Sequence, residues 1–549
     1  MQIQIKSIQS KLLYSNALRV LIVVILMLGI FFRFANIDRK VYWHDEAFTS
    51  LRISGYEKSE MVRQIFNGQV ISLEELNKYQ HPNSEKGLFG TIKGLATEEP
   101  QHPPLYYVIV RFWAQLFGSS VTVIRNLSAL ISLLVFPSIY WLSLELFESS
   151  LVGWIAILLV AVSPFHVLFA QEAREYVLWT VTILLSSTAF LRAMRLKTNL
   201  SWGIYAASLT LNLYTFLFSG LVAIGHGIYV LVTESFRLSK TVKAYLLASF
   251  VGFLAFTPWI LIIIINLRAI KNTLSWTNKD SSWLFLAKTW CLNLSRVFLD
   301  VDKNAFFDVD LSLNNPITYL SLLIVILIGY SIYILCRETP KKVWLFVLTL
   351  IGSTALTLLL PDLILGGRRS VVSRYLFPCV LGIQLAVAYL LTTRITSVSI
   401  NKQTQKLWQL LAITLFSIEV LSCTTTYGTE VTWNKTMSCY NPQVSHIINQ
   451  ANRPLLISND DGNNPAYILS LSHLLEPKLH LQLVREPNIP IIPDGFSEIF
   501  LFNPSETLLH GLEKEQKYEI EPVYKPTCRG ASGDSLWQIE LWKLAKKNI

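Results

Sequence analysis

The segment YWHDEAFTS, residues 42–50, places three titratable side chains in a row directly after the first long apolar run of the chain. His44, Asp45 and Glu46 are adjacent in it. A carboxylate can take a proton from a hydroxyl group, and an imidazole can hold a proton or an anion. The segment therefore predicts a site of acid–base chemistry, with Asp45 as the candidate base.

Side chains with related chemistry recur in later segments that also border apolar runs. They are His81, Gln101, His102, Gln171, Glu172, Arg174, Tyr176, Arg368, Arg369 and Arg374. A single residue of this kind is most often a solvated loop residue. Acidic groups that accept a proton, combined with His and Arg that hold an anion, together suit a site that acts on a lipid phosphate.

The amino-acid composition indicates which kind of protein holds these residues in place. Hydrophobic residues make up 52% of the 549 residues and charged residues only 15%, which is typical of an integral membrane protein. The formal net charge of +10 does not point to nucleic acid, because many Lys and Arg residues lie in short loops between apolar runs. The six cysteines show no metal-ligand spacing, and a disulfide between Cys439 and Cys528 is left open.

Eleven apolar runs are long enough to be candidate membrane spans. They cover 17–35, 122–146, 151–170, 175–192, 201–217, 218–234, 244–267, 317–336, 343–361, 374–393 and 406–424. Basic residues before the first run and in the loops RAMRLK, RLSKTVK and RETPKK predict a cytoplasmic N-terminus and cytoplasmic loops. We expect a multi-pass protein of the bacterial plasma membrane, with the first run retained as an anchor.

The run PPLYYVIVRFWAQLFG, residues 103–118, is too short to span a membrane and would reverse the side of every later basic loop. Its apolar residues recur at helical spacing, while Arg111 and Gln115 lie four residues apart. We therefore predict an amphipathic helix in the outer interface. This choice places the first loop (36–121), QEAREY (171–176), LGGRRSVVSRY (365–375) and the tail on the extracytoplasmic side.

The tail changes character after residue 424. Alternating segments PLLIS, LHLQLV, EIFLF, YEIEPVY and LWQIELWKL predict strands, and residues 464–475 predict a helix. NDDGNN (459–464) is interpreted as a turn, since it lacks the ligand spacing of a calcium loop. We expect a transmembrane domain over 1–424, with interfacial helices in its 36–121 loop, and a soluble extracytoplasmic α/β domain over 425–549.

A sugar carried on a lipid phosphate already has a good leaving group. The reaction then needs a base for the acceptor hydroxyl and a cationic group for the departing phosphate. Asp45 is the natural base, and Arg or His side chains at the same interface are the natural clamp.

Four segments in a fixed order carry a resemblance to a known family. They are WHDEAFTS, QHPPLYYVIVRFWAQLFGSSVTVIRNLSALISLL, SPFHVLFAQEAREYVLW and SRYLFP. The chain resembles the polyprenyl-phosphate-sugar-dependent GT-C glycosyltransferases, in the branch of protein O-mannosyltransferases, aminoarabinose transferases and Rgt-like enzymes. The resemblance is strong over 36–195, weaker to 424, and absent from the tail.

This resemblance implies an α-helical GT-C fold and a cell-envelope enzyme that transfers a hexosyl or pentosyl group, with inversion, to a hydroxyl of a lipid, glycan or protein. It implies Asp45 as the catalytic carboxylate and Glu46 as its companion. The implied donor-binding or architectural residues are His102, Gln171, Glu172, Arg174, Tyr176, Arg374 and Tyr375. The chain departs from many relatives at 214–217, where YTFL replaces a more polar YTHY segment.

Alternatives from other classes stay open. A polytopic lipid or glycan transporter or flippase would have the same apolar bulk, but would place its charges at mid-membrane depth. A membrane scaffold without activity is a third reading. No cofactor is predicted, although Asp300, Asp302, Asp308 and Asp310 in DVDKNAFFDVD leave a divalent cation open.

Overall fold

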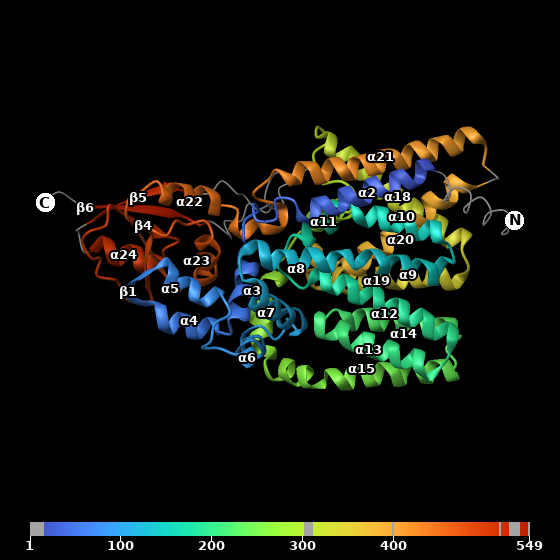
Figure 1. Cartoon of the computed structure of the whole chain (residues 1–549), viewed down its shortest axis with the longest axis horizontal. Coiled ribbons are helices and arrows are strands. Elements are labelled where there is room, and N and C mark those ends of the chain that lie inside the picture. The colour runs from blue at the N-terminus through green and yellow to red at the C-terminus, as the bar shows by residue number, and fades with distance from the viewer. Residues whose placement is uncertain (1–15, 301–310, 398–399, 515–517, 526–538, 547–549) are drawn as a thin grey trace.

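The computed structural model describes residues 16–300, 311–397, 400–514, 518–525 and 539–546. Long helices lie side by side along the longest axis, and a mixed β-sheet lies beyond one end of them (Figure 1). The first described helix, α2 (Asn16–Phe34), begins at the end of the helix bundle that is farther from the sheet (Figure 1). The predicted combination of a helical membrane domain and a small C-terminal sheet is confirmed.

Every predicted apolar run corresponds to a helix or a pair of helices. After α2 these are α8 (Val121–Leu133), α9 (Val135–Phe147), α10 (Ser150–Ala161), α11 (Pro164–Ala170), α12 (Tyr176–Leu196), α13 (Asn199–Thr215), α14 (Ser219–Thr233), α15 (Lys240–Ile265), α18 (Pro316–Glu338), α19 (Lys341–Leu365), α20 (Phe377–Thr396) and α21 (Lys402–Tyr427). Within the described residues, seven helical segments are long and apolar enough to span a membrane, or eight if a bent pair counts as one. The protein is thus a multi-pass membrane protein, while the count of eleven spans stays a prediction.

The bent pair consists of α10 and α11, whose axes differ by 61°. Pro164 is the first residue of α11, where its missing N–H costs no hydrogen bond and its ring prevents α10 from continuing. The second helix ends at Ala170, and residues 171–175 form a buried turn before α12, which begins at Tyr176. The polar QEAREY residues thus lie where the bent pair meets α12.

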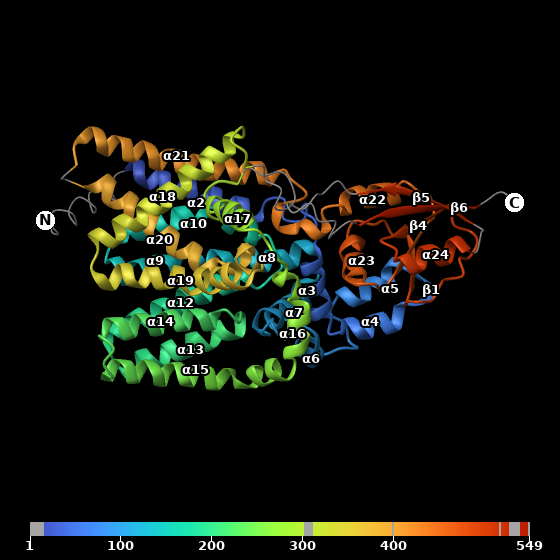
Figure 2. The same cartoon turned by 180° about the vertical axis from the view of Figure 1, so that it is seen from behind.

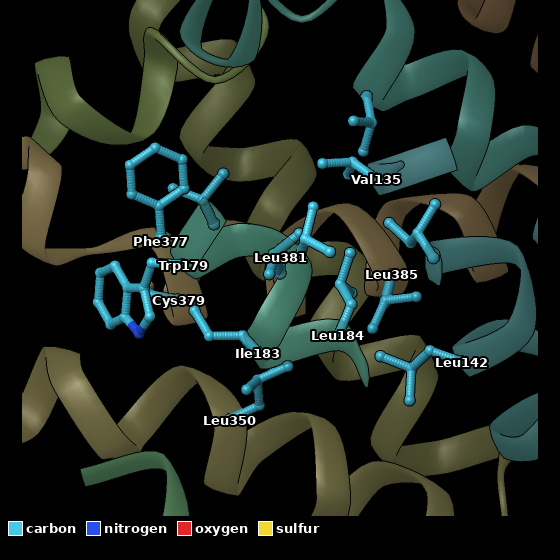
Figure 3. Close-up of a cluster of buried hydrophobic side chains, with 14 of the residues drawn as sticks. Val135, Leu142, Trp179, Ile183, Leu184, Leu350, Phe377, Cys379, Leu381 and Leu385 are labelled. Carbon is cyan, nitrogen blue, oxygen red and sulfur yellow. The ribbon is translucent and has the colours of Figure 1, made fainter. Parts of the chain in front are cut away.

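The core of the membrane domain lies where α9, α12, α19 and α20 meet. Side chains from all four helices converge there, including Leu142, Trp179, Leu350 and Leu381 (Figure 3). Most faces of α12 and α20 are buried, whereas α15 and α21 leave much of their apolar surface exposed, as expected for helices that face lipid. The bundle is a rigid support for the groups at its sheet-side end.

The six-stranded sheet has the order β1-β3-β2-β4-β6-β5. Its strands are β1 (Asn67–Ser72), β2 (Pro454–Asn459), β3 (His480–Val484), β4 (Glu498–Phe502), β5 (Tyr518–Tyr524) and β6 (Leu541–Lys546). The central β3-β2-β4 set is parallel, with Leu456 opposite both Leu481 and Phe500, and the outer pairs are antiparallel. Three helices accompany the sheet: α22 (Asn441–Asn449), α23 (Asn464–Ser472) and α24 (Glu506–Lys514). The predicted strands PLLIS, LHLQLV, EIFLF and YEIEPVY are therefore present, and part of LWQIELWKL lies outside the described residues.

One strand of this sheet does not come from the tail. β1 belongs to the 36–121 loop and pairs with β3, so that Ile71 lies opposite Leu481. The sequence gives little sign of it, because NGQVIS is an edge strand with only one buried side chain. The 425–549 segment is thus joined to the first loop by strand pairing, and the single sheet contains strands from both sides of the predicted domain boundary at 424.

The rest of the 36–121 loop lies beside the sheet and at its junction with the bundle (Figure 1). It forms α3 (His44–Ser54), α4 (Lys58–Ile65), α5 (Leu73–Asn77), α6 (Leu88–Glu98) and α7 (Leu105–Phe117), and both views place α3 and α7 at the junction (Figures 1 and 2). The predicted helix at 103–118 is present as α7. Arg111 on this helix is buried and donates to the carbonyl oxygen of Ile53 at 2.5 Å, so it binds the loop.

Candidate active site

The candidate site begins at the first turn of α3. Trp43 is extended and precedes the helix, and Glu46 accepts a hydrogen bond from the Trp43 N–H at 3.4 Å. The first-turn position suits both Asp45 and Glu46, because the free N–H groups of a helix start favour negative charge. The helix ends at Gly55, whose φ of 92° is in the left-handed region that glycine adopts most readily. Both carboxylates are thereby held at the junction between bundle and sheet.

The Glu46 carboxylate is completely buried and fully engaged. Oε1 accepts from Arg125 Nε and from the Ala173 N–H, each at 2.8 Å. Oε2 accepts from Arg125 Nη2 and from Lys435 Nζ, each at 2.7 Å. Although burial opposes ionisation, Arg125 and Lys435 lower the pKa of Glu46 to about 2. This carboxylate joins four parts of the chain and has no free oxygen for a substrate.

The neighbouring Asp45 carboxylate is less enclosed. Its side chain is 16% exposed, His44 Nε2 lies 3.0 Å from Oδ1, and Arg374 Nη2 lies 4.0 Å from Oδ2. Burial raises the pKa of Asp45, but His44, Arg374 and Arg174 outweigh burial and hold this pKa below its usual value. Burial lowers the pKa of His44, although Asp45 beside it raises this pKa. Asp45 is therefore an ionised carboxylate with one oxygen oriented by His44 and the other facing a guanidinium group.

Arg174 and His102 meet at a second carboxylate, Glu175. His102 Nδ1 lies 2.7 Å from Glu175 Oε1, and Arg174 Nε lies 3.4 Å from Glu175 Oε2. Arg174 Nη2 lies 3.2 Å from His102 Nε2, and its Nη1 donates to the Asp45 carbonyl oxygen at 3.2 Å. Burial opposes ionisation of Glu175, yet Arg174 and His102 lower its pKa to about 2. Both ring nitrogens of His102 are thus within reach of protein groups.

Gln171 and Glu172 hold the backbone and side chains around α3. The Gln171 amide donates to the carbonyl oxygens of Phe32 and Ala35 at 2.8 and 2.9 Å and accepts from Lys40 at 2.7 Å. Glu172 accepts from Trp43 Nε1 at 3.0 Å and from Asn434 Nδ2 at 2.9 Å. These contacts are intramolecular and buried. They match the architectural role that the resemblance left open for this motif.

Arg374 is the cation with the most capacity for a ligand. It lies in a short 3₁₀ segment, η4 (Ser373–Tyr375), and its side chain is 24% exposed. The guanidinium carbon lies 5.8 Å from the Trp43 ring centre and 5.7 Å from the Tyr375 ring centre, and among the described residues it makes no hydrogen bond. Tyr375 also lies near Phe218, and Tyr176 stacks on Phe377 with ring centres 6.3 Å apart. The site therefore has aromatic walls beside a cation whose hydrogen-bond donors are uncommitted.

Other residues from the predicted set lie apart from Asp45 or are bound elsewhere. His81 Nδ1 lies 2.7 Å from Ser119 Oγ, and Arg369 forms a 2.9 Å ion pair with Asp362. Asp300 accepts from Trp433 Nε1 at 2.7 Å, while Asp302, Asp308 and Asp310 lie outside the described residues. In the described part of the chain no group of three or more His, Cys, Asp or Glu side chains has the arrangement of a metal site.

Four residues at the site were not predicted from the sequence: Arg125, Glu175, Asn434 and Lys435. Arg125 lies inside an apolar run, where its charge was a signal, since an arginine in such a run needs a buried partner. Glu175 belongs to the quoted QEAREY motif, but it was not among the predicted site residues. Asn434 and Lys435 lie in a polar stretch nearly 400 residues away from Glu46, and no local pattern indicates that contact.

A family model described as dolichyl-phosphate-mannose-protein mannosyltransferase matches residues 101–262. This region begins just before α7 and ends within α15, and it includes His102 and the whole QEAREY turn. A comparison with curated proteins found no match. The family match agrees with the resemblance carried by the sequence motifs.

Solved structures with the same architecture include ArnT from Cupriavidus metallidurans. The crystal structure of ArnT bound to undecaprenyl phosphate has a TM-score of 0.52 at 12% identity, over 96% of this chain and 98% of that chain. The apo structure of ArnT has a TM-score of 0.50 at 12% identity over the same shares. The likeness covers the helical bundle and the C-terminal sheet alike. The GT-C fold that the sequence motifs implied is confirmed.

Proposed function

We propose that this chain is a membrane glycosyltransferase that moves a sugar from a polyprenyl phosphate to an acceptor hydroxyl at the Asp45 end of the helix bundle. The observation that carries the proposal is the facing pair of an ionised carboxylate and an uncommitted guanidinium, Asp45 and Arg374, whose closest atoms are 4.0 Å apart. The pair combines a proton acceptor with an anion-binding group, which are the two groups that glycosyl transfer from a phosphate requires.

The reaction follows from these two groups. The acceptor oxygen forms a bond to the anomeric carbon while the bond from that carbon to the phosphate oxygen breaks. The proton of the acceptor hydroxyl passes to the Asp45 carboxylate, and the electron pair of the broken bond leaves with polyprenyl phosphate. Attack on the face opposite the leaving phosphate inverts the anomeric centre. Arg374 stabilises the charge that develops on the departing phosphate.

His102 acts indirectly in this proposal. Its ring nitrogens lie 2.7 Å from Glu175 Oε1 and 3.2 Å from Arg174 Nη2, so it orders Arg174. Arg174 in turn holds the backbone carbonyl oxygen of Asp45. Arg374 then makes the direct phosphate contact, beside the rings of Trp43 and Tyr375. Glu46, Gln171 and Glu172 position these groups without touching the substrate.

The donor and its location rest on the fold. The ArnT structure with this architecture is bound to undecaprenyl phosphate, which supports a polyprenyl phosphate as the lipid carrier here. The site lies at the sheet-side end of the bundle, where α3 and α7 meet the ends of the long helices (Figure 2). We place this end on the extracytoplasmic face of a bacterial plasma membrane and the N-terminus in the cytoplasm, because the basic loops follow the positive-inside rule. Hexosyl and pentosyl donors both fit the proposed chemistry.

The test uses the purified full-length chain in lipid nanodiscs with a panel of synthetic polyprenyl-phosphate hexoses and pentoses. Acceptors are a membrane extract and short glycans, and mass spectrometry measures the glycosylated product and free polyprenyl phosphate. The proposal expects stoichiometric sugar transfer and phosphate-lipid release with at least one donor. A second assay places the same protein in sealed vesicles. Movement of intact donor across the vesicle membrane, without cleavage in either assay, would contradict the proposal and favour a transporter.

A further inference from the structure

The segment η5 (Trp433–Ser438) comes from the start of the C-terminal region and lies against the first turn of α3. Lys435 Nζ donates to Glu46 Oε2 at 2.7 Å and to the Val41 carbonyl oxygen at 3.2 Å. The side chains of Lys435 and Glu46 are both fully buried. A residue of the C-terminal region thus contacts the residue next to the candidate base.

Two further residues of η5 hold the residues on the other side of Asp45. Ser438 Oγ accepts from the His44 N–H at 3.2 Å. Asn434 Nδ2 donates to Glu172 Oε2, and the other oxygen of Glu172 accepts from Trp43 Nε1. Residues on both sides of Asp45, namely Trp43, His44 and Glu46, are therefore restrained by one short segment.

These contacts determine where the Asp45 carboxylate lies. Asp45 itself makes no direct hydrogen bond to η5, and its facing cation Arg374 comes from η4, a different element. A shift of the α3 first turn would change the separation of Asp45 and Arg374 without removing either group. Small misplacements of a reacting group have large kinetic effects.

We propose that η5 is the positioning element of the active site, with Lys435 as its central positioning residue, so that the C-terminal region is part of the catalytic unit. This inference rests on the proposed glycosyl transfer. It assigns a function to a region that carries no recognised motif. It also explains why the sheet includes β1 from the α3 loop, since that pairing joins the same two parts of the chain at a second place.

Lys435→Met tests the inference with little risk to the fold. The substitution keeps most of the side-chain volume, and it leaves Glu46 in a complete two-bond pair with Arg125, at 2.8 and 2.7 Å. The remaining pair is electrically neutral. Lys514→Met is the matched control, because Lys514 is exposed at the end of α24 on the same region.

Each variant is measured as full-length protein for kcat, donor KM and unfolding midpoint. We expect Lys435→Met to lower kcat by about tenfold or more and to leave donor KM within about threefold, because Arg374 still binds the donor. Asn434→Ala should show a smaller loss of the same kind. Wild-type kcat in Lys435→Met would overturn the inference, and so would a loss explained entirely by a lowered unfolding midpoint.

Hydrogen exchange separates failure of this inference from failure of the proposed reaction. Amides of α3 should exchange faster in Lys435→Met than in wild type, whereas Lys514→Met should leave them unchanged. This readout requires no enzymatic activity. Unchanged α3 exchange in Lys435→Met would overturn the positioning role even if wild-type protein transferred no sugar to the acceptors used.

Discussion

Asp45 and Glu46 are consecutive residues on one helical turn, yet their carboxylates have opposite surroundings. Glu46 is fully buried, and its two oxygens accept close hydrogen bonds from Arg125, Lys435 and the Ala173 N–H. Asp45 is partly exposed, with one oxygen near His44 and the other 4.0 Å from Arg374. Glu46, whose two oxygens are fully hydrogen-bonded, therefore has a structural role. Asp45, whose oxygens are only partly engaged, is available to react with a substrate.

The pKa shifts follow the same division. Against burial, Arg125 and Lys435 lower the pKa of Glu46 to about 2. The stability that this ion pair contributes is present above the unfolded value of 4.5 and is lost only as pH falls toward 2. Glu46 therefore stays ionised as a structural charge at neutral pH.

The largest expected effect is the loss of stability when the structural carboxylate, Glu46, is replaced. Glu46→Gln removes the negative charge between Arg125 and Lys435 and leaves two buried cations without compensation. We expect a loss of roughly 3–5 kcal/mol in unfolding free energy, the scale for breaking a buried ion pair. Denaturant unfolding in nanodiscs measures it, with exposed Glu74→Gln as the control. If Glu46→Gln unfolds at the same denaturant concentration as the wild type, Glu46 does not have the structural role given to it here.

The next effect tests the cation that faces Asp45. Arg374→Ala should weaken donor binding by about 1.5–3 kcal/mol, because a charged hydrogen bond to phosphate is lost. Binding of a fluorescent polyprenyl-phosphate analogue is the measurement. Arg369→Ala is the matched control, since Arg369 is committed to Asp362. Equal donor affinity in Arg374→Ala and wild type would exclude Arg374 from the phosphate site.

A smaller effect is expected at Glu175, which orders His102 and Arg174. Glu175→Gln keeps the size of the side chain but weakens its hydrogen bonds to both partners. We expect a fall in kcat/KM that corresponds to a loss of about 1 kcal/mol in transition-state stabilisation. This loss is smaller than the loss expected when a charged hydrogen bond is removed completely. Steady-state kinetics with donor and acceptor varied separately measures the change. No change in kcat/KM would show that the His102 and Arg174 geometry does not depend on this charge.

The last effect concerns the pH dependence of stability that Glu172 causes. Burial raises the pKa of Glu172 to about 7, from 4.5 in the unfolded chain. Between pH 4.5 and about 7, the Glu172 carboxyl group is therefore protonated in the folded protein and ionised in the unfolded chain. Stability from this group therefore falls as pH rises from 4.5 to about 7, and Glu172→Gln should flatten that part of the profile. Unfolding midpoints across this range measure it. Parallel pH profiles for wild type and Glu172→Gln would contradict the raised pKa.

Much of the fold was predictable because its signals are local. Apolar runs predicted the helices, and alternating residues predicted strands β2 to β6. Short interruptions predicted the loops that hold the candidate site. The edge strand β1 escaped prediction because one buried side chain in six residues carries almost no pattern. Its pairing with β3 is specified by tertiary packing and not by its own sequence.

The candidate site was predictable in part for a similar reason. Asp45, Arg174 and Arg374 border apolar runs, where charged residues are conspicuous. Lys435 was missed because a lysine in a polar stretch looks solvated, and only the fold brings it against Glu46. The spacing of Arg111 and Gln115 predicted an amphipathic helix, but it did not predict that Arg111 is buried against backbone carbonyl oxygens. The spacing of residues along a helix predicts which side chains share one face of the helix. It does not predict which other part of the chain packs against that face.

The most direct test of the account is the turnover of Asp45→Asn with a polyprenyl-phosphate sugar, measured beside its unfolding curve. Asparagine keeps the shape and much of the hydrogen bonding but cannot accept the proton. We predict that turnover falls by about 10² or more, as for loss of a general base, while the unfolding midpoint stays close to wild type. Sugar transfer at the wild-type rate by folded Asp45→Asn would contradict the assignment of Asp45 as the base.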